Sequence, residues 1–176
     1  MTSQPTLHSE RFVLYPLSDE HLEFQVRLDA IPEVMRYITK RPRTRPEVEE
    51  RFHIYRGFAR NSGMGAWTVC WREHPQDPIG IAILKPLDGE DAAHLNEIEV
   101  GYRLVPAAWG QGVATEITRT LIAYGFDELG LSRIVGLTDT ENDASGRVLE
   151  KAGLTRDGTI VYANETVPFY VINRNT

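Results

Sequence analysis

Two glycines, Gly110 and Gly112, stand in a bend between a predicted strand and the start of a predicted helix. The N-terminus of a helix presents backbone N–H groups that have no intrahelical partner, together with the positive end of the helix dipole. Glycine has no side chain to obstruct a ligand that approaches the backbone. The bend is therefore suited to binding a diphosphate, although a Gly-x-Gly before a helix can equally be a tight turn without a ligand.

The residues around the bend do not match two common nucleotide-binding motifs. No Gly-Lys-Ser or Gly-Lys-Thr follows it, as a P-loop requires. The dinucleotide fingerprint places a glycine where Thr115 stands and begins a βαβ unit, whereas this bend follows three antiparallel-looking strands. A nucleotide-dependent enzyme that binds a dinucleotide is an alternative that the order of elements disfavours.

Glu99 is the leading candidate for acid–base chemistry. It lies in a predicted strand, and the alternation of a strand places it on the face opposite Val100 and Tyr102. A carboxylate in the middle of a strand that helices cover on both sides is costly unless it has a partner or a purpose. A salt bridge to Arg103 or a solvated face explains the acid as well as catalysis does, and Glu97 is the other candidate for a base.

Ser145 and Asn142 are candidates in a short predicted helix. Ser145 shares helical spacing with Leu149 and Ala152, so it faces inward with the apolar side chains. An inward serine hydroxyl commonly bonds a carbonyl one turn earlier. Asn142 stands at the N-cap position, a role that requires no other function.

The elements that must position these residues form a single domain over residues 1–176 with an α/β (α+β) fold. A basic loop broken by prolines, KRPRTRP, occupies residues 40–46, and turns are predicted at 74–78 and Gly89–Ala93. Strands are predicted near residues 10–17, 67–71, 79–83, 98–104, 133–138, 155–163 and 166–173, and helices near 18–30, 33–37, 48–59, 113–130 and 143–152.

Composition narrows the class of protein further. The formal net charge is −6, from 25 acidic and 19 basic residues, which argues against a nucleic-acid partner. No stretch approaches the roughly 18 apolar residues of a membrane span. Cys70 is the only cysteine and the five histidines lack metal-ligand spacing, so no metal is expected. These features predict a cytoplasmic protein with neither a membrane nor a nucleic-acid partner.

Four segments resemble the GNAT (Gcn5-related) N-acetyltransferases, specifically the ribosomal-protein-alanine acetyltransferase (RimJ/RimL-like) branch. They are SERFVLYPL at 9–17, EVGYRL at 99–104, WGQGVA at 109–114 and NDASGRVLEKAGL at 142–154. The resemblance runs in order over nearly the whole chain. It implies a mixed, mostly antiparallel sheet of about seven strands, which is flanked by helices and splayed at a cofactor cleft.

The same resemblance implies that acetyl-coenzyme A is the co-substrate and that its pantetheine lies between the strands near 98–105 and 132–138. Backbone groups around Val100 and Tyr102 would orient the acetyl carbonyl, and Asn142 would bond the pantetheine. The phosphate cradle would consist of Gly110, Gln111, Gly112, Val113, Ala114 and Thr115.

The implied reaction is acetyl transfer to a primary amine by direct attack in a ternary complex. Glu99 would be the base, directly or through water. Many relatives use a tyrosine as the acid at the position of Leu149, so Ser145 becomes the candidate acid here. A non-catalytic coenzyme A-binding sensor is the alternative. A homodimer is plausible for the branch, while the acceptor, a protein N-terminus or a small amine, is left open. Acidic residues that could attract a cationic acceptor are Glu10, Glu33, Asp88 and Glu165.

Overall fold

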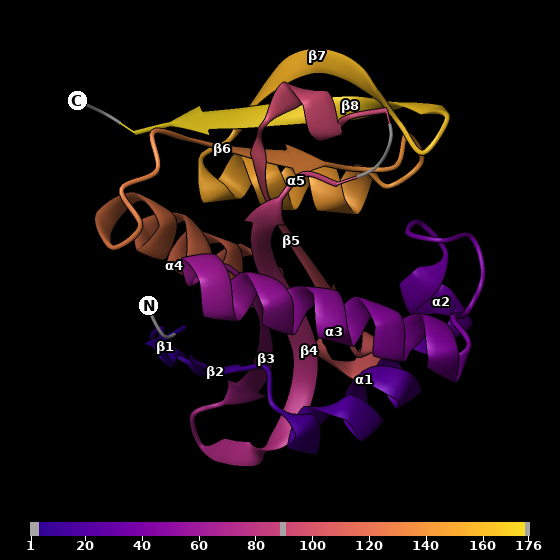
Figure 1. Ribbon diagram of the computed structural model, residues 1–176, viewed down its shortest axis with the longest axis vertical. Coiled ribbons are helices and arrows are strands. Elements are labelled where there is room, and N and C mark those ends of the chain that lie inside the picture. Colours follow the sequence, from indigo (N-terminus) through magenta and orange to yellow (C-terminus); the bar gives the residue numbers. More distant parts are fainter. Residues whose placement is uncertain (1–3, 89–90, 175–176) are drawn as a thin grey trace.

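The computed structural model describes residues 4–88 and 91–174, which form one open eight-stranded sheet with helices on both faces (Figure 1). The strands are β1 (Leu7–His8), β2 (Phe12–Pro16), β3 (Gly65–Trp71), β4 (His74–Pro86), β5 (Ile98–Leu104), β6 (Arg133–Leu137), β7 (Thr155–Tyr162) and β8 (Glu165–Asn173). The helices are α1 (Leu22–Asp29), α2 (Pro32–Met35), α3 (Arg45–Ser62), α4 (Val113–Asp127) and α5 (Asp143–Ala152). Short 3-10 turns cover Asp19–His21, Ala93–Leu95 and Pro106–Ala108.

The sheet divides at the boundary between β5 and β6. Strands β1 to β5 form an antiparallel meander in chain order, and β6, β8 and β7 form a second antiparallel group. The two groups meet through a parallel pairing in which Glu99 of β5 is in register with Val135 of β6. Because the ladder is confined to this point, β5 and β6 diverge beyond it, which is the splay that the family resemblance implies.

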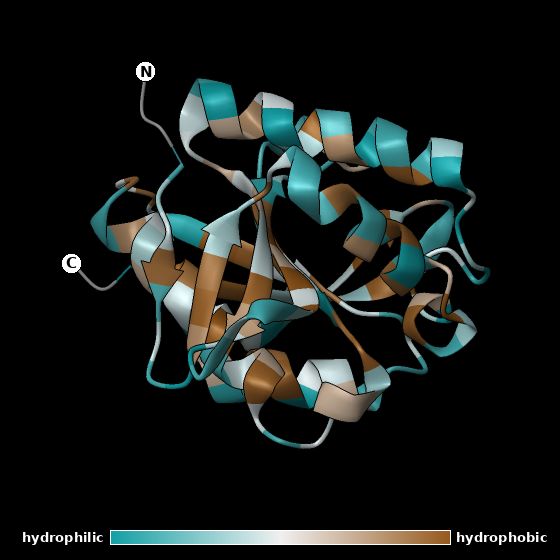
Figure 2. Cartoon of the chain, turned by 90° about the horizontal axis from the view of Figure 1, so that it is seen from below, coloured by the Kyte–Doolittle hydropathy of each residue, from teal (hydrophilic) through white to brown (hydrophobic). Residues whose placement is uncertain are grey.

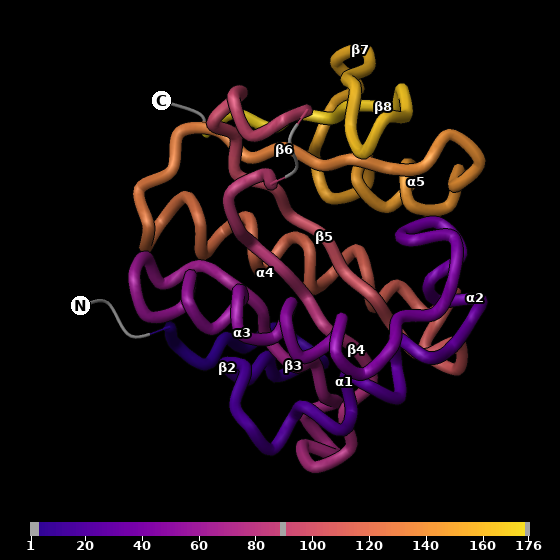
Figure 3. Tube along the Cα trace, turned by 45° about the vertical axis from the view of Figure 1, so that its right-hand side comes forward, coloured from indigo at the N-terminus to yellow at the C-terminus, as the bar shows by residue number. Residues whose placement is uncertain are grey.

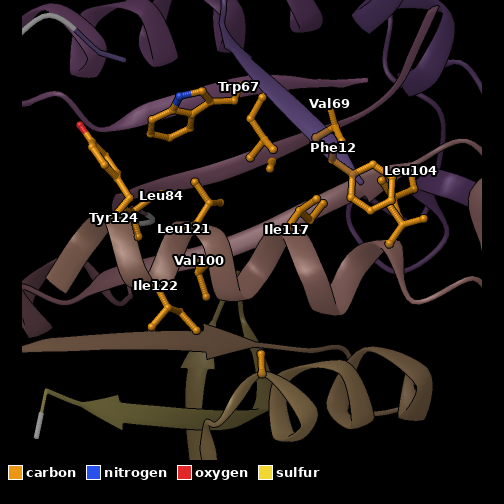
Figure 4. Close-up of a cluster of buried hydrophobic side chains, with 14 of the residues drawn as sticks. Phe12, Trp67, Val69, Leu84, Val100, Leu104, Ile117, Leu121, Ile122 and Tyr124 are labelled. Carbon is orange, nitrogen blue, oxygen red and sulfur yellow. The ribbon is translucent and has the colours of Figure 1, made fainter. Parts of the chain in front are cut away.

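Two hydrophobic clusters hold helices to opposite faces of the meander. On one face, Ile117 and Leu121 of α4 pack against Trp67 and Val100 of the strands (Figure 4). On the other face, Phe52 of α3 belongs to a second cluster together with residues of α1, α2 and β4. Figure 2 shows the apolar strands between helices that carry mostly hydrophilic residues on their outer sides. The charged residues of the site must therefore be accommodated between a strand and a helix.

Close packing fixes α5 against the second group of strands. A Cβ at Gly146 of α5 would lie 2.6 Å from the hydroxyl oxygen of Tyr170 in β8. A Cβ at Gly136 of β6 would lie 2.8 Å from methyl carbons of Leu149. Both glycines let α5 approach the sheet closely, and this sets the position of Ser145 on the same helix.

The structure confirms the α/β fold and most of the predicted elements. The turn predicted at 74–78 is wrong, because the chain reverses at Arg72 and Glu73 and β4 already begins at His74. A register shift where Cys70 pairs with Pro78 accommodates this proline-containing segment in the ladder. The two-residue β1 was not predicted, and part of the predicted turn Gly89–Ala93 lies outside the described residues. In the described part of the chain, no helix combines the length and apolarity needed to cross a membrane.

Candidate active site

A single cleft of about 1000 Å³ opens where β5 and β6 diverge. One half of its lining comes from the start of α4 and from α5, and the other half comes from α3 and the segment around α2. Figures 1 and 3 show α2 and the loop after it on the same side of the molecule as the start of α5. Lys40 of that loop forms ion pairs with Asp139 and Glu165, so the two halves are joined at one end of the cleft.

The glycine bend predicted as a phosphate cradle lies at the start of α4. Gly110 and Gly112 have φ angles of 73° and 74°, a left-handed conformation that side chains disfavour, and Gly112 is the N-cap of α4. A Cβ at Gly110 would meet no atom within 4 Å, so the space above the bend is open. Val113, Ala114 and Thr115 follow in the first turn, where backbone N–H groups lack intrahelical acceptors. All of the predicted cradle residues except Gln111 line the cleft.

Side chains outside the cradle hold it in place. Arg11 donates from Nη1 to the carbonyl of Gln111 at 2.9 Å and from Nε to Glu116 of α4 at 2.7 Å. The side chain of Gln111 bonds back to the carbonyl of Ala107 at 2.6 Å, and Trp109 donates from Nε1 to the carbonyl of Leu104 at 2.9 Å. The backbone of the bend is therefore fixed before any ligand binds.

Ser145 lies in the cleft beside a residue whose side chain the sequence analysis did not consider. The phenol of Tyr102 in β5 donates to Oγ of Ser145 at 3.3 Å. Asn142 is the N-cap of α5, as predicted, and its Oδ1 accepts the backbone N–H of Ser145 at 3.1 Å. Burial raises the pKa of the Tyr102 phenol, although its hydrogen bond to Ser145 acts in the opposite direction. The pair thus presents two protonated hydroxyls to the cleft.

Glu99 lies in the cleft and is paired with Lys85 rather than with Arg103. Lys85 and Glu99 stand directly opposite each other in the β4–β5 register and form an ion pair through Oε1 of the carboxylate. The salt bridge to Arg103 that the sequence left as an alternative does not form, because Arg103 is paired with Asp29 instead. The Glu99 side chain keeps 12% exposure, and one salt bridge does not use all the acceptor sites of a carboxylate.

Lys85 is a fixed cation beneath the cleft. Its side chain is 1% exposed, and its three ammonium donors face Glu99, Oδ1 of Asp88 at 2.8 Å and the carbonyl of Pro86 at 3.2 Å. Burial acts to lower the pKa of Lys85, but the charge of Glu99 and the hydrogen bond to Asp88 outweigh burial and raise it. Lys85 therefore stays protonated and does not serve as a base.

Burial raises the pKa of Glu99 above its ordinary value, even though the charge of Lys85 acts to lower it. Lys85 is shared with Asp88, whose negative charge also raises the pKa of Glu99. Asp88 in turn accepts from Nη1 of Arg51 in α3 at 3.0 Å and from the hydroxyl of Tyr162 at 3.4 Å. A carboxylate with a raised pKa is a better proton acceptor than an ordinary glutamate, as a general base requires.

The alternative base, Glu97, has a different environment. It accepts from Nε of Arg133 in β6 at 2.9 Å. Among the described residues that line the cleft, Glu99 is present and Glu97 is not. The geometry thus favours Glu99 of the two acids that the sequence left open.

Arg103 points to the same side of the sheet as Glu99 but toward α1. Its Nε donates to Oδ1 of Asp29 at 2.8 Å, and Nη1 of Arg43 donates to Oδ2 of the same carboxylate at 2.8 Å. Arg43 belongs to the basic loop that was noted in the sequence without a role. Lys85, Arg43 and the Tyr102 phenol were all missed as site residues, although the position of Lys85 opposite Glu99 follows once β4 and β5 are paired in register.

The other candidates of the sequence take structural or peripheral positions. Cys70 is buried, and burial raises the pKa of its thiol to about 11, so it is not an activated nucleophile. No cluster of three metal-ligating side chains occurs within residues 4–88 and 91–174. Arg147 and Lys151 of α5 line the half of the cleft that contains the cradle.

Comparisons with known proteins agree on the family. The family model described as "Acetyltransferase (GNAT) domain" matches residues 11–155. The chain is 36% identical to FsC-acetyl coenzyme A-N(2)-transacetylase of Aspergillus fumigatus over 171 residues, which cover 94% of this chain and 72% of that protein. It is 25% identical to spermidine N(1)-acetyltransferase of Escherichia coli K12, over 90% of this chain and 79% of the relative.

Solved structures show the same fold. An acetyltransferase from Agrobacterium tumefaciens C58 superposes with a TM-score of 0.85 at 24% identity, covering 99% of this chain and 97% of that chain. Aminoglycoside acetyltransferase AAC(6')-Ib in complex with coenzyme A gives 0.79 at 18% identity, covering 93% and 95%. RimL in complex with coenzyme A gives 0.76 at 14% identity, covering 96% and 98%. At 14% identity RimL shares the fold alone, so the expected RimJ/RimL branch is not established.

Proposed function

Because the chain belongs to the GNAT acetyltransferase family and is an acetyl-coenzyme A-dependent N-acetyltransferase, we propose that it acetylates a small primary amine by direct attack in a ternary complex. In this proposal Glu99 accepts the proton of the amine. Ser145, supported by Tyr102, supplies a proton or a hydrogen bond to the departing sulfur.

The observation that carries the proposal is the continuity of the cleft. One cavity reaches from the glycine cradle at Gly112 past Ser145 to Glu99 and α3. A cofactor in one half and an acceptor in the other would meet between Ser145 and Glu99. Direct attack requires such a meeting, since holding both reactants in place turns a bimolecular step into an effectively unimolecular one.

The cofactor half would bind acetyl-coenzyme A largely through the backbone. The pyrophosphate would lie on the N–H groups of Gln111 to Ala114, with open space above Gly110. Asn142 and the β5 backbone at Val100 and Tyr102 would orient the pantetheine and the acetyl carbonyl. Coenzyme A is present in two of the structural neighbours, which supports this assignment.

Proton transfer would occur at two places. Glu99 takes a proton from the bound ammonium before it attacks as the neutral amine, or from the nitrogen as the C–N bond forms, which the raised pKa of its carboxyl favours. The C–S bond breaks as the tetrahedral intermediate collapses, and the thiolate receives a proton from the Ser145 hydroxyl. Tyr102 donates to Ser145 and would replace the proton that Ser145 gives up. A phenol from β5 would thus serve in place of the helix tyrosine of many relatives, at whose position this chain has Leu149.

Two observations favour a small amine over a protein N-terminus. The two named relatives that match along most of this chain act, by their names, on FsC and on spermidine. The ion pairs of Lys40 with Asp139 and Glu165 cross one end of the cleft, which narrows access for a polypeptide.

The test follows thiol release from acetyl-coenzyme A with a panel of small amines and N-terminal peptides. We expect turnover with small amines, and a loss of about a hundredfold to ten-thousandfold in kcat for Glu99→Gln. Glu97→Gln is the matched control and is expected to retain most activity, because Arg133 engages Glu97 at 2.9 Å. Binding of coenzyme A without turnover of any acceptor would support a sensor instead, and equal activity of Glu99→Gln would remove Glu99 as the base.

A further inference from the structure

The acceptor half of the cleft contains two guanidiniums that share one carboxylate. Asp29 of α1 is fully buried and accepts from both Arg43 and Arg103. The side chains of Arg43 and Arg103 are 10% and 5% exposed, and both line the cleft. Because one negative charge faces two positive ones, this cluster carries an excess positive charge within the protein.

The donors of this cluster are not all used by the protein. Within the described residues, Nη2 of Arg103 is buried and has no hydrogen-bond partner. A buried guanidinium nitrogen without an acceptor is costly, and such groups in native structures call for an explanation. Because Nη2 itself has almost no accessible surface, it shows that the cluster has more donors than acceptors, and an anionic ligand would contact guanidinium nitrogens other than Nη2.

The surroundings of Tyr55 report the same positive field. Burial alone would raise the pKa of the Tyr55 phenol, but the charges of Arg103 and Arg51 outweigh burial and lower it. Burial and the charge of Arg103 also lower the pKa of Arg43. Both effects show the positive charge of Arg103 acting on its neighbours Tyr55 and Arg43.

Among the described residues, the other charged groups that line the acceptor half show no comparable surplus of positive charge. Lys85 and Arg51 are matched by Glu99 and Asp88 in one network. Lys40 is paired with two carboxylates at the end of the cleft, and Glu33 and Arg36 both line the cleft near α2. The cation pair at Asp29 is therefore the part of the cleft where an anion is most strongly favoured.

From this cluster, and resting on the proposed function, we propose that the acceptor is an amine that also carries a carboxylate, which Arg43 and Arg103 bind. Guanidinium and carboxylate groups form charge-assisted, often bidentate hydrogen bonds. The amine would lie near Glu99, with the carboxylate farther along β5 beyond Gly101.

The distance between Glu99 and Arg103 sets the distance between the amine and the carboxylate of the acceptor. Glu99 and Arg103 project from the same face of β5, and about 13 Å of strand separates them at roughly 3.3 Å per residue. Their long side chains shorten this span but do not close it. The amine and the carboxylate of the acceptor are therefore separated by several bonds, unlike those of an α-amino acid.

This acceptor differs from the cationic one that the acidic residues of the sequence suggested. Asp88 is engaged by Lys85 and Arg51, and Glu165 is paired with Lys40. The relative named for spermidine acts on a compound of a different charge type, at only 25% identity. The structure thus predicts that a second amine on the acceptor is disfavoured.

The test compares acceptors that differ only at the far end. 6-Aminohexanoate, its primary amide and 1,6-diaminohexane share a six-carbon chain with a primary amine at one end, and the diamine has a second, equivalent amine at the other. The 4-carbon series repeats the comparison. We expect kcat/KM for the carboxylate to exceed that for the amide by roughly tenfold or more, and the diamine to be poorest. Equal values, or a preference for the diamine, would overturn the inference while leaving the acetyltransferase activity established. Absence of turnover in every series would contradict the proposed function itself.

Variants of Arg43 test whether the two arginines cause the preference for a carboxylate. Arg43→Gln should bring the carboxylate-to-amide ratio of kcat/KM close to one, and Arg43→Lys, which keeps the charge but not the paired donors, should give an intermediate ratio. Arg60→Gln, on an exposed part of α3, is the control and should leave the ratio unchanged. If Arg43→Gln does not fold, the wild-type comparison still decides the matter. A folded Arg43→Gln protein with an unchanged ratio would exclude this pair as the carboxylate site.

Discussion

The two halves of the cleft offer a ligand different kinds of contact. The cofactor half presents backbone N–H groups, two left-handed glycines and neutral hydroxyls on contiguous stretches of chain around Gly112 and Ser145. The acceptor half is built from ionised side chains that come from α1, the basic loop, α3, β4 and β5. Backbone recognition suits a ligand that is common to a whole family, whereas charged side chains can differ from one member to the next.

The contrast extends to the way each half is held rigid. The cradle is fixed by side chains such as Arg11 that bond the backbone from outside. In the acceptor half the side chains that would contact the ligand also hold one another, as Lys85 does between Glu99 and Asp88. A substitution in the cofactor half should therefore alter one ligand contact, while a substitution in the acceptor half should alter several charges together.

Among the variants that test this comparison, the largest effect on kcat is expected for the hydroxyl pair of Ser145 and Tyr102, where the two halves meet. Ser145→Ala should lower kcat by roughly tenfold to a hundredfold, near the lower end for a general acid, because a thiolate leaves more readily than an alkoxide. Tyr102→Phe should lower kcat by a smaller factor, since Ser145 remains. Steady-state kinetics at saturating acetyl-coenzyme A measure both.

The double variant separates a relay from two independent contacts. If Tyr102 acts through Ser145, the double variant should be no slower than Ser145→Ala alone. Multiplied losses would show that each hydroxyl acts separately. A large rise in KM for acetyl-coenzyme A with unchanged kcat would assign the pair to binding alone.

The cofactor half was largely predictable from the sequence because its chemistry is local. Gly110 and Gly112 are adjacent to the helix start whose N–H groups they expose, and Asn142 and Ser145 lie within one helical turn. Alternation along β5 also placed Glu99 and Arg103 on the face away from Val100. Each of these inferences needs only the geometry of a single helix or strand.

The acceptor half was not predictable because its contacts join distant segments. Asp29 and Arg103 are 74 residues apart in the chain, and Arg51 and Asp88 are 37 apart. The partner of Glu99 depended on the β4–β5 register, and Lys85 lay outside the predicted strand 79–83, whereas β4 extends to Pro86. Nothing in KRPRTRP distinguishes Arg43, which turns inward to Asp29, from Arg41, which pairs with Glu47 on the surface.

A smaller effect tests whether the cradle acts through its backbone. Gly112→Ala should raise KM for acetyl-coenzyme A by about tenfold, because a left-handed φ costs an alanine roughly 1–2 kcal/mol and the bend would relax. Isothermal titration with coenzyme A measures the affinity directly. Gly57→Ala is the control, since Gly57 lies within α3 with open space around it and should gain about 0.5–1 kcal/mol of stability. Unchanged affinity in Gly112→Ala would mean that the bend does not shape the phosphate site.

Substitution of Lys85, the ion-pair partner of Glu99, should have the smallest effect on kcat/KM at neutral pH. It is also the most informative test of the acceptor half. Burial raises the pKa of Glu99 and Lys85 counteracts that rise, so Lys85→Met should raise the pKa further. The active form is the carboxylate, which accumulates as the pH rises through this pKa. The acid limb of the kcat/KM profile should therefore move to higher pH, with rates lost mainly on the acidic side and recovered as the pH increases.

Lys85→Arg keeps the charge and should leave the limb near its wild-type position. Because Lys85 also holds Asp88, the profile must be measured on protein whose folding has been checked by circular dichroism. A limb that stays in place in folded Lys85→Met would show that the acid limb reports a group other than Glu99, and the base would then have to be sought elsewhere in the cleft.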